Sequence, residues 1–327
     1  MLQELGDVKV CKVRKPSASA VGASWFFPWG GSARVLNCDW GWYLMELNDP
    51  AWRTYWQGEV LRQVQANQDD GIFMDSLSVP NYLGGGRFQP PLPDVDNAFE
   101  SAWAARIRNW LAWLQTQPLG HYYLVPNASS WITTCDPTDY SAADGLMIEG
   151  FALEADQSPY AYEDWQLQMD RILGAVRRGQ AIIAQTYAAG DRERLFALGS
   201  YLLVKSSHPY LNIDLGFEPE WWPEYDIPVG TATEGATTSI ADLYDSANQV
   251  YRRDFDNGFV LVNSTSPWDG SGITRTVSLG GSYYLAEPSS GGEVPASGLP
   301  TGSLSYRAVT SVVLPPFSAA VLLNSRP

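Results

Sequence analysis

The sequence has few of the residues that build metal and thiol active sites. It contains two histidines and three cysteines among 327 residues. The cysteines, Cys11, Cys38 and Cys135, show no CxxC spacing, and their odd number argues against a complete disulfide framework. We therefore expect no zinc site built from His and Cys, and no other metal or cofactor is indicated.

Long apolar runs are also missing. No stretch approaches the roughly 18 apolar residues of a membrane span, and no basic-then-apolar leader precedes the first predicted strand. The sequence therefore predicts no membrane partner. An extracellular or periplasmic location would require a signal outside this chain.

The sequence has few basic residues: 36 acidic residues outnumber 21 basic ones, which gives a formal net charge of −15. Such a chain repels nucleic acid and anionic membrane surfaces, and it suits a neutral or cationic substrate better. Aromatic residues, in contrast, are abundant, with 14 Trp and 17 Tyr. Flat aromatic faces match the apolar faces of sugar rings, although a single Trp can equally fill the core.

Short apolar runs alternate with helical patterns over the first three quarters of the chain. This alternation is typical of parallel β-α units. The predicted strands are 8–13, 71–76, 121–127, 145–151, 180–187 and 210–214, and the predicted helices are 51–67, 99–117, 162–178 and 192–205. A further strand at 201–206 could equally be the end of the last helix.

Both an open doubly wound sheet and a closed (β/α)8 TIM-type barrel fit this alternation. No glycine-rich phosphate loop follows the first strand, which removes the commonest reason to choose the open sheet. The barrel also brings polar residues at the C-terminal strand ends to one face, where active sites of such barrels lie. These residues are Lys15, Asp75, Asn127, Glu149, Gln185, Tyr187 and Asp214.

The number of predicted strands and the change in composition after Asn248 define the predicted domains. Six strands are clear, so we expect the barrel to lack its first strand, and the exposed edge would favour a homo-oligomer. After Asn248 the sequence becomes rich in β-strand residues and Gly, Ser and Pro turns, with an Asn-Gly hairpin signal in FDNGF. The sequence thus predicts a barrel domain over 1–248 and a small antiparallel β-sandwich domain over 249–327.

Two acidic residues follow apolar runs in the same way, Asp75 after IFM and Glu149 after LMI. Paired carboxylates are what cleavage of a glycosidic bond needs, since one attacks or orients while the other protonates the leaving oxygen. Each acid could instead pair with a basic residue or cap a helix, and a carboxylate site for Mg²⁺ or Ca²⁺ stays open. A catalytic serine is disfavoured because no G-x-S-x-G motif is present.

Three segments carry a family resemblance. They are NDPAWRTYWQGEVLRQVQANQDDGIFMDS (48–76), GLMIEGF (145–151) and VYRRDFDNGFVLVNST (250–265). Together they resemble the glycosyl hydrolase-like TIM-barrel families that carry a C-terminal β domain. More distantly, they are similar to the dextranase and cycloisomaltooligosaccharide glucanotransferase group.

The resemblance implies roles for the two acids. It implies that Asp75 is the nucleophile or base and that Glu149 is the general acid/base of a glycoside hydrolase or transglycosylase. Other polar or aromatic residues are expected to bind the sugar or to neutralise an acid. These are Asn127, Lys15, Trp40, Gln185, Tyr187 and Asp214.

Two other functions remain open at this point. The cleft could bind carbohydrate without turnover, as a degenerate glycosidase barrel. Alternatively, the C-terminal β domain could serve a structural or assembly role.

Overall fold

The protein is described by a computed structural model that covers residues 22–32, 34–82, 87–93, 96–206, 209–217, 219–235 and 237–327. The chain divides into two compact units, Met1–Ile148 and Glu149–Pro327, and each is described by itself. The domain boundary at 248/249 stays a prediction. No helix in the described ranges is both long and apolar enough to cross a membrane.

The first unit contains short parallel strands. β3 (Gly71–Met74) pairs in parallel with β5 (Tyr123–Pro126), so that Gly71 lies opposite Tyr123 and Met74 opposite Pro126. A parallel bridge between Asn127 and Met147 then joins the end of β5 to β6 (Gly145–Glu149). The polar residues that follow β3 and β5 are therefore neighbours in space.

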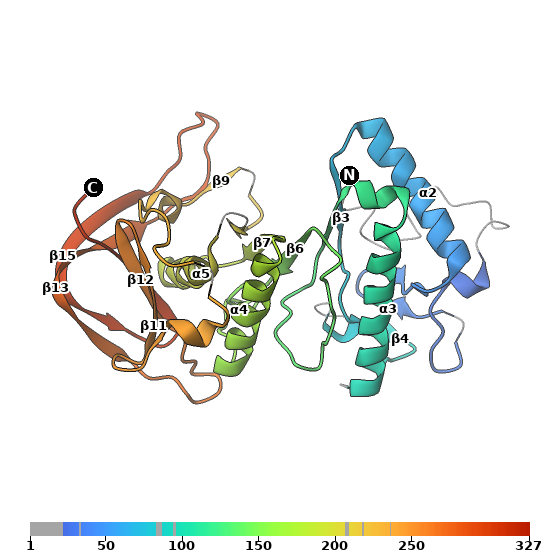
Figure 1. Cartoon of the computed structure of the whole chain (residues 1–327), viewed down its shortest axis with the longest axis horizontal. Helices are drawn as coiled ribbons and strands as arrows, with labels where there is room; N and C mark the ends of the chain where they lie inside the picture. Colours follow the sequence, from blue (N-terminus) through green and yellow to red (C-terminus); the bar gives the residue numbers. More distant parts are fainter. Residues whose placement is uncertain are drawn as a thin grey trace. The chain divides into compact units, whose positions relative to one another are not determined.

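Two long helices complete the first unit (Figure 1). α2 (Pro50–Asn67) begins one residue before the predicted 51–67 helix, because the Asp49 carboxylate caps it and accepts hydrogen bonds from the Ala51 and Trp52 amides at 2.9 and 2.8 Å. α3 (Asn97–Gln115) is capped in the same way by Asp96. The helices contact each other through tryptophan rings, with the Trp52 and Trp110 centroids 5.5 Å apart.

The aromatic segment before α2 contains two short strands that the sequence did not predict. β1 (Leu36–Asn37) pairs antiparallel with both β2 (Trp42–Tyr43) and β4 (Phe88–Gln89). These strands are too short to leave a periodic signal. The unit also contains the 3-10 helices η1 (Ala23–Trp25), η2 (Pro80–Tyr82) and η3 (Pro118–His121).

The second unit begins with a further alternation of helices and strands. Its elements are α4 (Tyr162–Arg177), β7 (Ala181–Thr186), α5 (Asp191–Val204) and β8 (Pro209–Ile213), and β7 pairs with β8 in parallel. α5 continues to Val204, so the 201–206 stretch is the end of a helix rather than a strand. The 8–13 strand lies outside the described residues.

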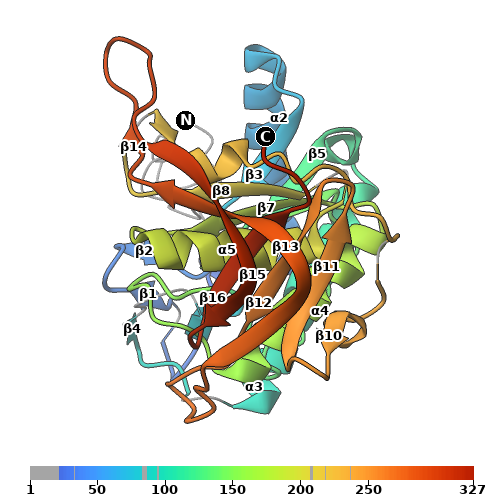
Figure 2. The same cartoon turned by 90° about the vertical axis from the view of Figure 1, so that its left-hand side faces the viewer.

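A six-stranded antiparallel sheet makes up the rest of the second unit (Figure 2). Its strand order is β10-β11-β12-β16-β13-β15. The pairing of the long strands β13 and β15 shifts register between Ser278 and Tyr283. The strands are β10 (Tyr244–Asp245), β11 (Val250–Phe255), β12 (Gly258–Asn263), β13 (Arg275–Ser289), β15 (Ser303–Leu314) and β16 (Ser318–Leu323).

The predicted hairpin at FDNGF is present, but its turn is placed one residue earlier than the Asn-Gly pair suggests. Phe255 pairs with Gly258, so Asp256 and Asn257 form the turn and Gly258 begins β12. A Cβ on Gly258 would collide with the Leu322 carbonyl oxygen of the neighbouring strand. Close backbone approach, rather than turn conformation, therefore requires this glycine.

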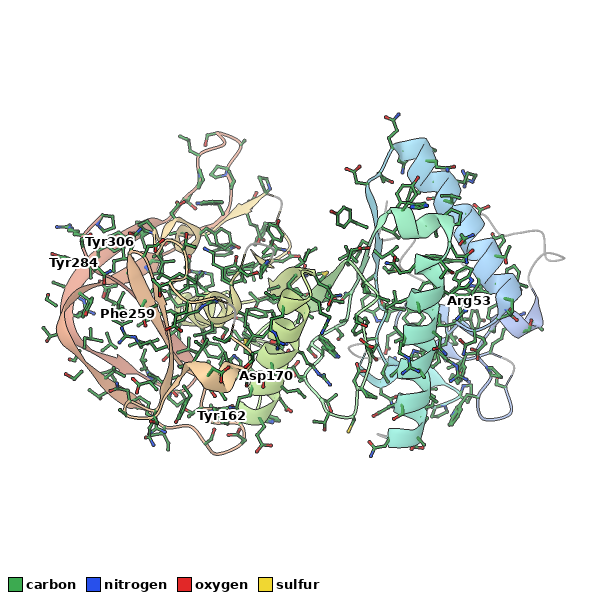
Figure 3. The ribbon with its side chains drawn as sticks, in the orientation of Figure 1. Arg53, Tyr162, Asp170, Phe259, Tyr284 and Tyr306 are labelled. Carbon is green, nitrogen blue, oxygen red and sulfur yellow. The ribbon has the colours of Figure 1, made fainter. Side chains whose placement is uncertain are left out.

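Side-chain contacts fix α4 within the second unit (Figure 3). The Asp170 carboxylate accepts hydrogen bonds from the Ser239 hydroxyl and the Ile240 amide, which belong to the start of η5 (Ile240–Leu243). At the N-terminal end of α4, the Tyr162 hydroxyl lies 2.8 Å from that of Tyr251. The remaining short elements are β9 (Glu220–Trp221), η4 (Pro223–Asp226) and β14 (Gly292–Glu293).

α5 packs closely on the antiparallel sheet at Gly199. A Cβ there would collide with the Ala319 side chain and would come within 3.0 Å of a Val262 methyl group. We expect Gly199→Ala to lower the free energy of unfolding by about 1–3 kcal/mol, because the core is overpacked.

Gly174 in α4 provides a matched control for this prediction. A Cβ there would meet only the Arg178 guanidinium, at 3.6 Å. Gly174→Ala should therefore stabilise the chain by roughly 0.5–1 kcal/mol through helix propensity. Urea denaturation of both variants measures the two effects, and equal midpoints would contradict the close packing at Gly199.

The observed elements form a mixed α/β protein with several sheets. This agrees with the predicted α/β class. The closed barrel and the sandwich form of the C-terminal strands stay predictions.

Candidate functional site

Asp75 follows β3 directly and is half-buried. Its Oδ1 accepts a hydrogen bond from the Asn127 side-chain amide at 2.9 Å and another from the Ser76 backbone amide at 2.9 Å. Ser76 has a φ of 55°, a left-handed conformation that is uncommon for a residue other than glycine. The chain thus turns sharply after the carboxylate, and two donors fix the orientation of the carboxylate.

Asn127 connects Asp75 to the end of β5. Only 3% of Asn127 is exposed, and its Oδ1 accepts a hydrogen bond from the Ser129 amide at 2.9 Å. Its backbone amide donates to the Met74 carbonyl at 2.8 Å, and its carbonyl accepts from the Leu77 amide at 3.1 Å. Asn127 therefore acts on Asp75 as a rigid positioning residue, a contact that the predicted role in sugar binding did not include.

Aromatic residues surround the segment that follows Asp75. Trp42, Trp103, Ser76 and Ser78 contribute to the wall of a pocket of about 30 Å³. A buried water needs roughly 10–15 Å³, so this pocket has room for one or two waters and is too small for a sugar ring. Trp40, in the same segment as Trp42, is 59% exposed.

Glu149 is half-buried at the end of β6, and a sharp turn follows it, as after Asp75. Gly150 has a φ of 81°, which favours glycine. The Phe151 amide then donates to the Gln185 carbonyl at 2.8 Å, which ties the turn to β7. The carboxylate thus stands at a strand end with its backbone fixed to the neighbouring strand.

A buried glutamine on α4 holds the turn after Glu149. Gln168 donates through Nε2 to the Gly150 carbonyl at 3.1 Å and accepts from the Ala152 amide at 2.8 Å. The Tyr160 hydroxyl also donates to the Gly150 carbonyl, at 2.6 Å. Because two polar side chains satisfy the backbone of this turn, the position of Glu149 is well determined.

Tyr187 brings three predicted site residues together. Its hydroxyl donates a hydrogen bond to Glu149 Oε1 and accepts one from Gln185 Nε2 at 3.1 Å. Burial raises the pKa of the Tyr187 hydroxyl well above its ordinary value, and the charges of Glu149 and Asp214 raise it further. Tyr187 therefore remains a protonated donor to the Glu149 carboxylate at neutral pH.

Asp214 follows β8 and is half-buried. Its amide donates to the Thr186 carbonyl at 2.9 Å, and its Oδ1 accepts from the Gly216 amide at 2.9 Å. Lys15 lies outside the described residues. Among the residues that the structure describes, no group of three or more His, Cys, Asp and Glu side chains is arranged to hold a metal ion.

Sequence reasoning missed Gln168 and Tyr160, which hold the turn after Glu149. A signal for Gln168 was available. It lies on the apolar face of the predicted 162–178 helix, close to Trp165, Met169 and Ile172. A polar residue on such a face is expected to bind a buried backbone group.

The Tyr187 hydrogen bond allows a direct kinetic test. If Glu149 is the general acid/base that the sequence predicts, Tyr187→Phe should reduce kcat of glycoside cleavage about 10- to 100-fold, the range for losing a hydrogen bond to a charged group. The melting temperature should change little. Tyr162→Phe removes a tyrosine hydroxyl from the same unit and serves as the control. Equal kcat values for the two variants would show that the hydroxyl at position 187 does not act on Glu149.

A family model identifies the class of this chain. The model of Hypothetical glycosyl hydrolase family 15 matches residues 15–259, which is more than half of the sequence. The chain therefore belongs to this family, which confirms the resemblance to glycosyl hydrolase-like families. Membership supports a carbohydrate-active enzyme as the general class.

Two solved structures show partial likeness. The C-terminal domain of a predicted chitinase from Desulfitobacterium hafniense has a TM-score of 0.28 and 16% identity, covering 43% of this chain and 41% of that one. A β-porphyranase of glycoside hydrolase family 86 from the gut bacterium Bacteroides plebeius has a TM-score of 0.26 and 8% identity, covering 70% and 53%.

The chain thus spans about two fifths and one half of these two chains, respectively. At such scores the likeness supports no statement about fold or activity. No curated protein matches the sequence.

Proposed function

We propose that this protein is a glycoside hydrolase or transglycosylase that cleaves poly- or oligosaccharides with Asp75 and Glu149. One observation carries the proposal. In a chain of a glycosyl hydrolase family, Asp75 follows β3 and Glu149 is the last residue of β6. A side-chain donor holds each acid, Asn127 for Asp75 and Tyr187 for Glu149.

The proposed fold is a (β/α)8 barrel over 1–248 followed by a β-sandwich domain over 249–327. Parallel pairing of β3 with β5 and of β7 with β8 supports a barrel, since such barrels consist of parallel strands. On this fold the C-terminal strand ends form the active face.

Each carboxylate has a defined role in the proposed reaction. Glu149 donates a proton to the glycosidic oxygen as the bond to the anomeric carbon breaks. In a retaining reaction Asp75 attacks that carbon, and Glu149 then takes a proton from the water that releases the sugar. In an inverting reaction Asp75 instead takes the proton from a water that attacks directly.

The remaining predicted residues support this chemistry. Asn127 and Tyr187 orient the two acids, while Gln185 positions the Tyr187 hydroxyl. Trp40 offers an exposed ring on which a sugar of the substrate can stack. Asp214 and Lys15 are proposed to contact substrate hydroxyl groups.

The substrate and the stereochemical outcome of the reaction, retaining or inverting, can be tested together. Purified protein is incubated with a panel of polysaccharides and aryl glycosides, and new reducing ends are measured. Proton NMR of the first product then gives its anomeric configuration. Sugar binding without any new reducing end would instead support a non-catalytic carbohydrate-binding protein.

A further inference from the structure

A second pocket in the Glu149–Pro327 unit uses none of the proposed catalytic residues. Its volume is about 230 Å³, somewhat below the roughly 300–1,000 Å³ of sites for drug-sized ligands. It lies among α5, the start of β8 and the segment that contains η4. The residues considered below are Leu198, Lys205, Tyr210, Leu211, Glu224 and Ile227.

Glu224 is the most unusual residue in the wall of this pocket. Its side chain is fully buried, and Oε1 accepts a hydrogen bond from Arg194 Nε at 2.6 Å. Its other oxygen, Oε2, is also buried and accepts no hydrogen bond from any described residue. A buried carboxylate oxygen without a donor is costly, so a donor from a bound molecule would be favourable here.

The local charges favour a neutral ligand. Arg194 is buried beside Glu224 and also forms an ion pair with Asp191, while Lys205 contributes a further positive charge to the pocket. Two acidic and two basic groups therefore balance. A cation would meet Lys205 in the pocket wall and an anion would meet Glu224, so neither gains a net attraction.

The rest of the pocket suits the two faces of a sugar ring. Leu198, Leu211 and Ile227 supply apolar surface, and Tyr210 is 59% exposed beside them. Neutral sugars combine hydroxyl donors with apolar ring faces that stack on aromatic rings. Apolar walls, an aromatic side chain and one unsatisfied acceptor match that combination.

The pocket is also held in shape. Only 4% of Arg253 is exposed. Its Nη1 donates hydrogen bonds to the carbonyls of Leu202 and Lys205 at 3.0 and 2.8 Å. These bonds fix the C-terminal end of α5. Tyr225 accepts a hydrogen bond from the Ile213 amide at 2.9 Å, which fixes the η4 segment against β8.

We infer that this pocket is a second carbohydrate-binding site, which takes one neutral sugar unit. A sugar hydroxyl donates to Glu224 Oε2, and the ring stacks on Tyr210. The site binds sugar without cleaving it, because no second carboxylate faces Glu224 among the described lining residues. It would hold a polysaccharide chain on the protein while another part of that chain is cleaved.

Methyl NMR of the whole chain tests this site directly. The probes are glucose, xylose, N-acetylglucosamine and their β-1,4-linked trimers, with tetramethylammonium as the cationic probe. At least one sugar should shift the methyl resonances of Leu198, Leu211 and Ile227 with one common saturation curve. Tetramethylammonium should leave them unchanged.

Variants separate this site from the proposed catalytic one. Tyr210→Ala should weaken the binding read from these methyl groups about tenfold. Trp268 is 78% exposed in the same unit, and Trp268→Ala should leave this binding unchanged. Hydrolysis of a small aryl glycoside should be unchanged in Tyr210→Ala, so failure of this inference leaves the proposed function untouched.

Glu224→Gln provides the polar test, and Lys205→Ala replaces it if the Gln variant does not fold. Either should weaken sugar binding at least threefold. The inference is overturned if no sugar shifts these methyl resonances, if tetramethylammonium shifts them instead, or if Tyr210→Ala and Trp268→Ala bind sugar equally.

Discussion

Glu149→Gln is expected to reduce kcat/KM for polysaccharide cleavage by about 10²–10⁴-fold, the usual contribution of a general acid/base. Glutamine keeps the shape of the side chain and can still accept the Tyr187 hydrogen bond, but it cannot donate a proton to a leaving oxygen. The loss should therefore depend on the leaving group. Aryl glycosides with a strongly acidic phenol need little protonation and should lose far less activity.

The control for this variant is Glu293→Gln, which makes the same change at an exposed position in the same unit. It should match the parent on every substrate. A Glu149→Gln variant that loses activity equally on activated and unactivated substrates would contradict the general-acid role, although not a role in binding. Circular dichroism and melting temperature establish that both variants are folded.

Asp75→Asn is expected to have the largest effect, a loss of roughly 10⁴–10⁶-fold in kcat, as for removal of other catalytic nucleophiles. Asparagine can still accept the hydrogen bond from Asn127, so the local structure should survive. It cannot attack the anomeric carbon or take a proton from water. Unlike Glu149→Gln, this variant should lose activity on activated and unactivated substrates alike.

Asp70→Asn serves as the matched control for this second variant, because Asp70 is an exposed acid five residues earlier in the chain. It should leave kcat unchanged. For a retaining enzyme, a 2-deoxy-2-fluoro glycosyl fluoride should label the peptide that contains Asp75 with one sugar, as seen by mass spectrometry. A label on another carboxylate would contradict the assignment of Asp75.

Local signals predicted the elements that frame the site. The helical pattern over 51–67 predicted α2, and the structure places a helix over Pro50–Asn67. The apolar runs that end at Asp75 and Glu149 are β3 and β6. These elements depend on residues that are close together in the chain, so they can be predicted from the sequence alone.

The contacts that orient the acids could not be predicted in the same way. Tyr187 and Glu149 are 38 residues apart, and Asn127 and Asp75 are 52 residues apart. Their hydrogen bonds depend on the pairing of strands and on the turn that follows each strand. The sequence placed Asn127 and Tyr187 at strand ends, but only the folded chain shows which polar group each one meets.

Reducing-end release by the parent, Asp75→Asn and Glu149→Gln is the most direct test of the central claim. All three are assayed side by side on the polysaccharide that the parent cleaves fastest, after each is shown to be folded. The proposed pair predicts that the parent releases new reducing ends and that each variant is at least 100-fold slower. Two folded variants that cleave as fast as the parent would contradict it.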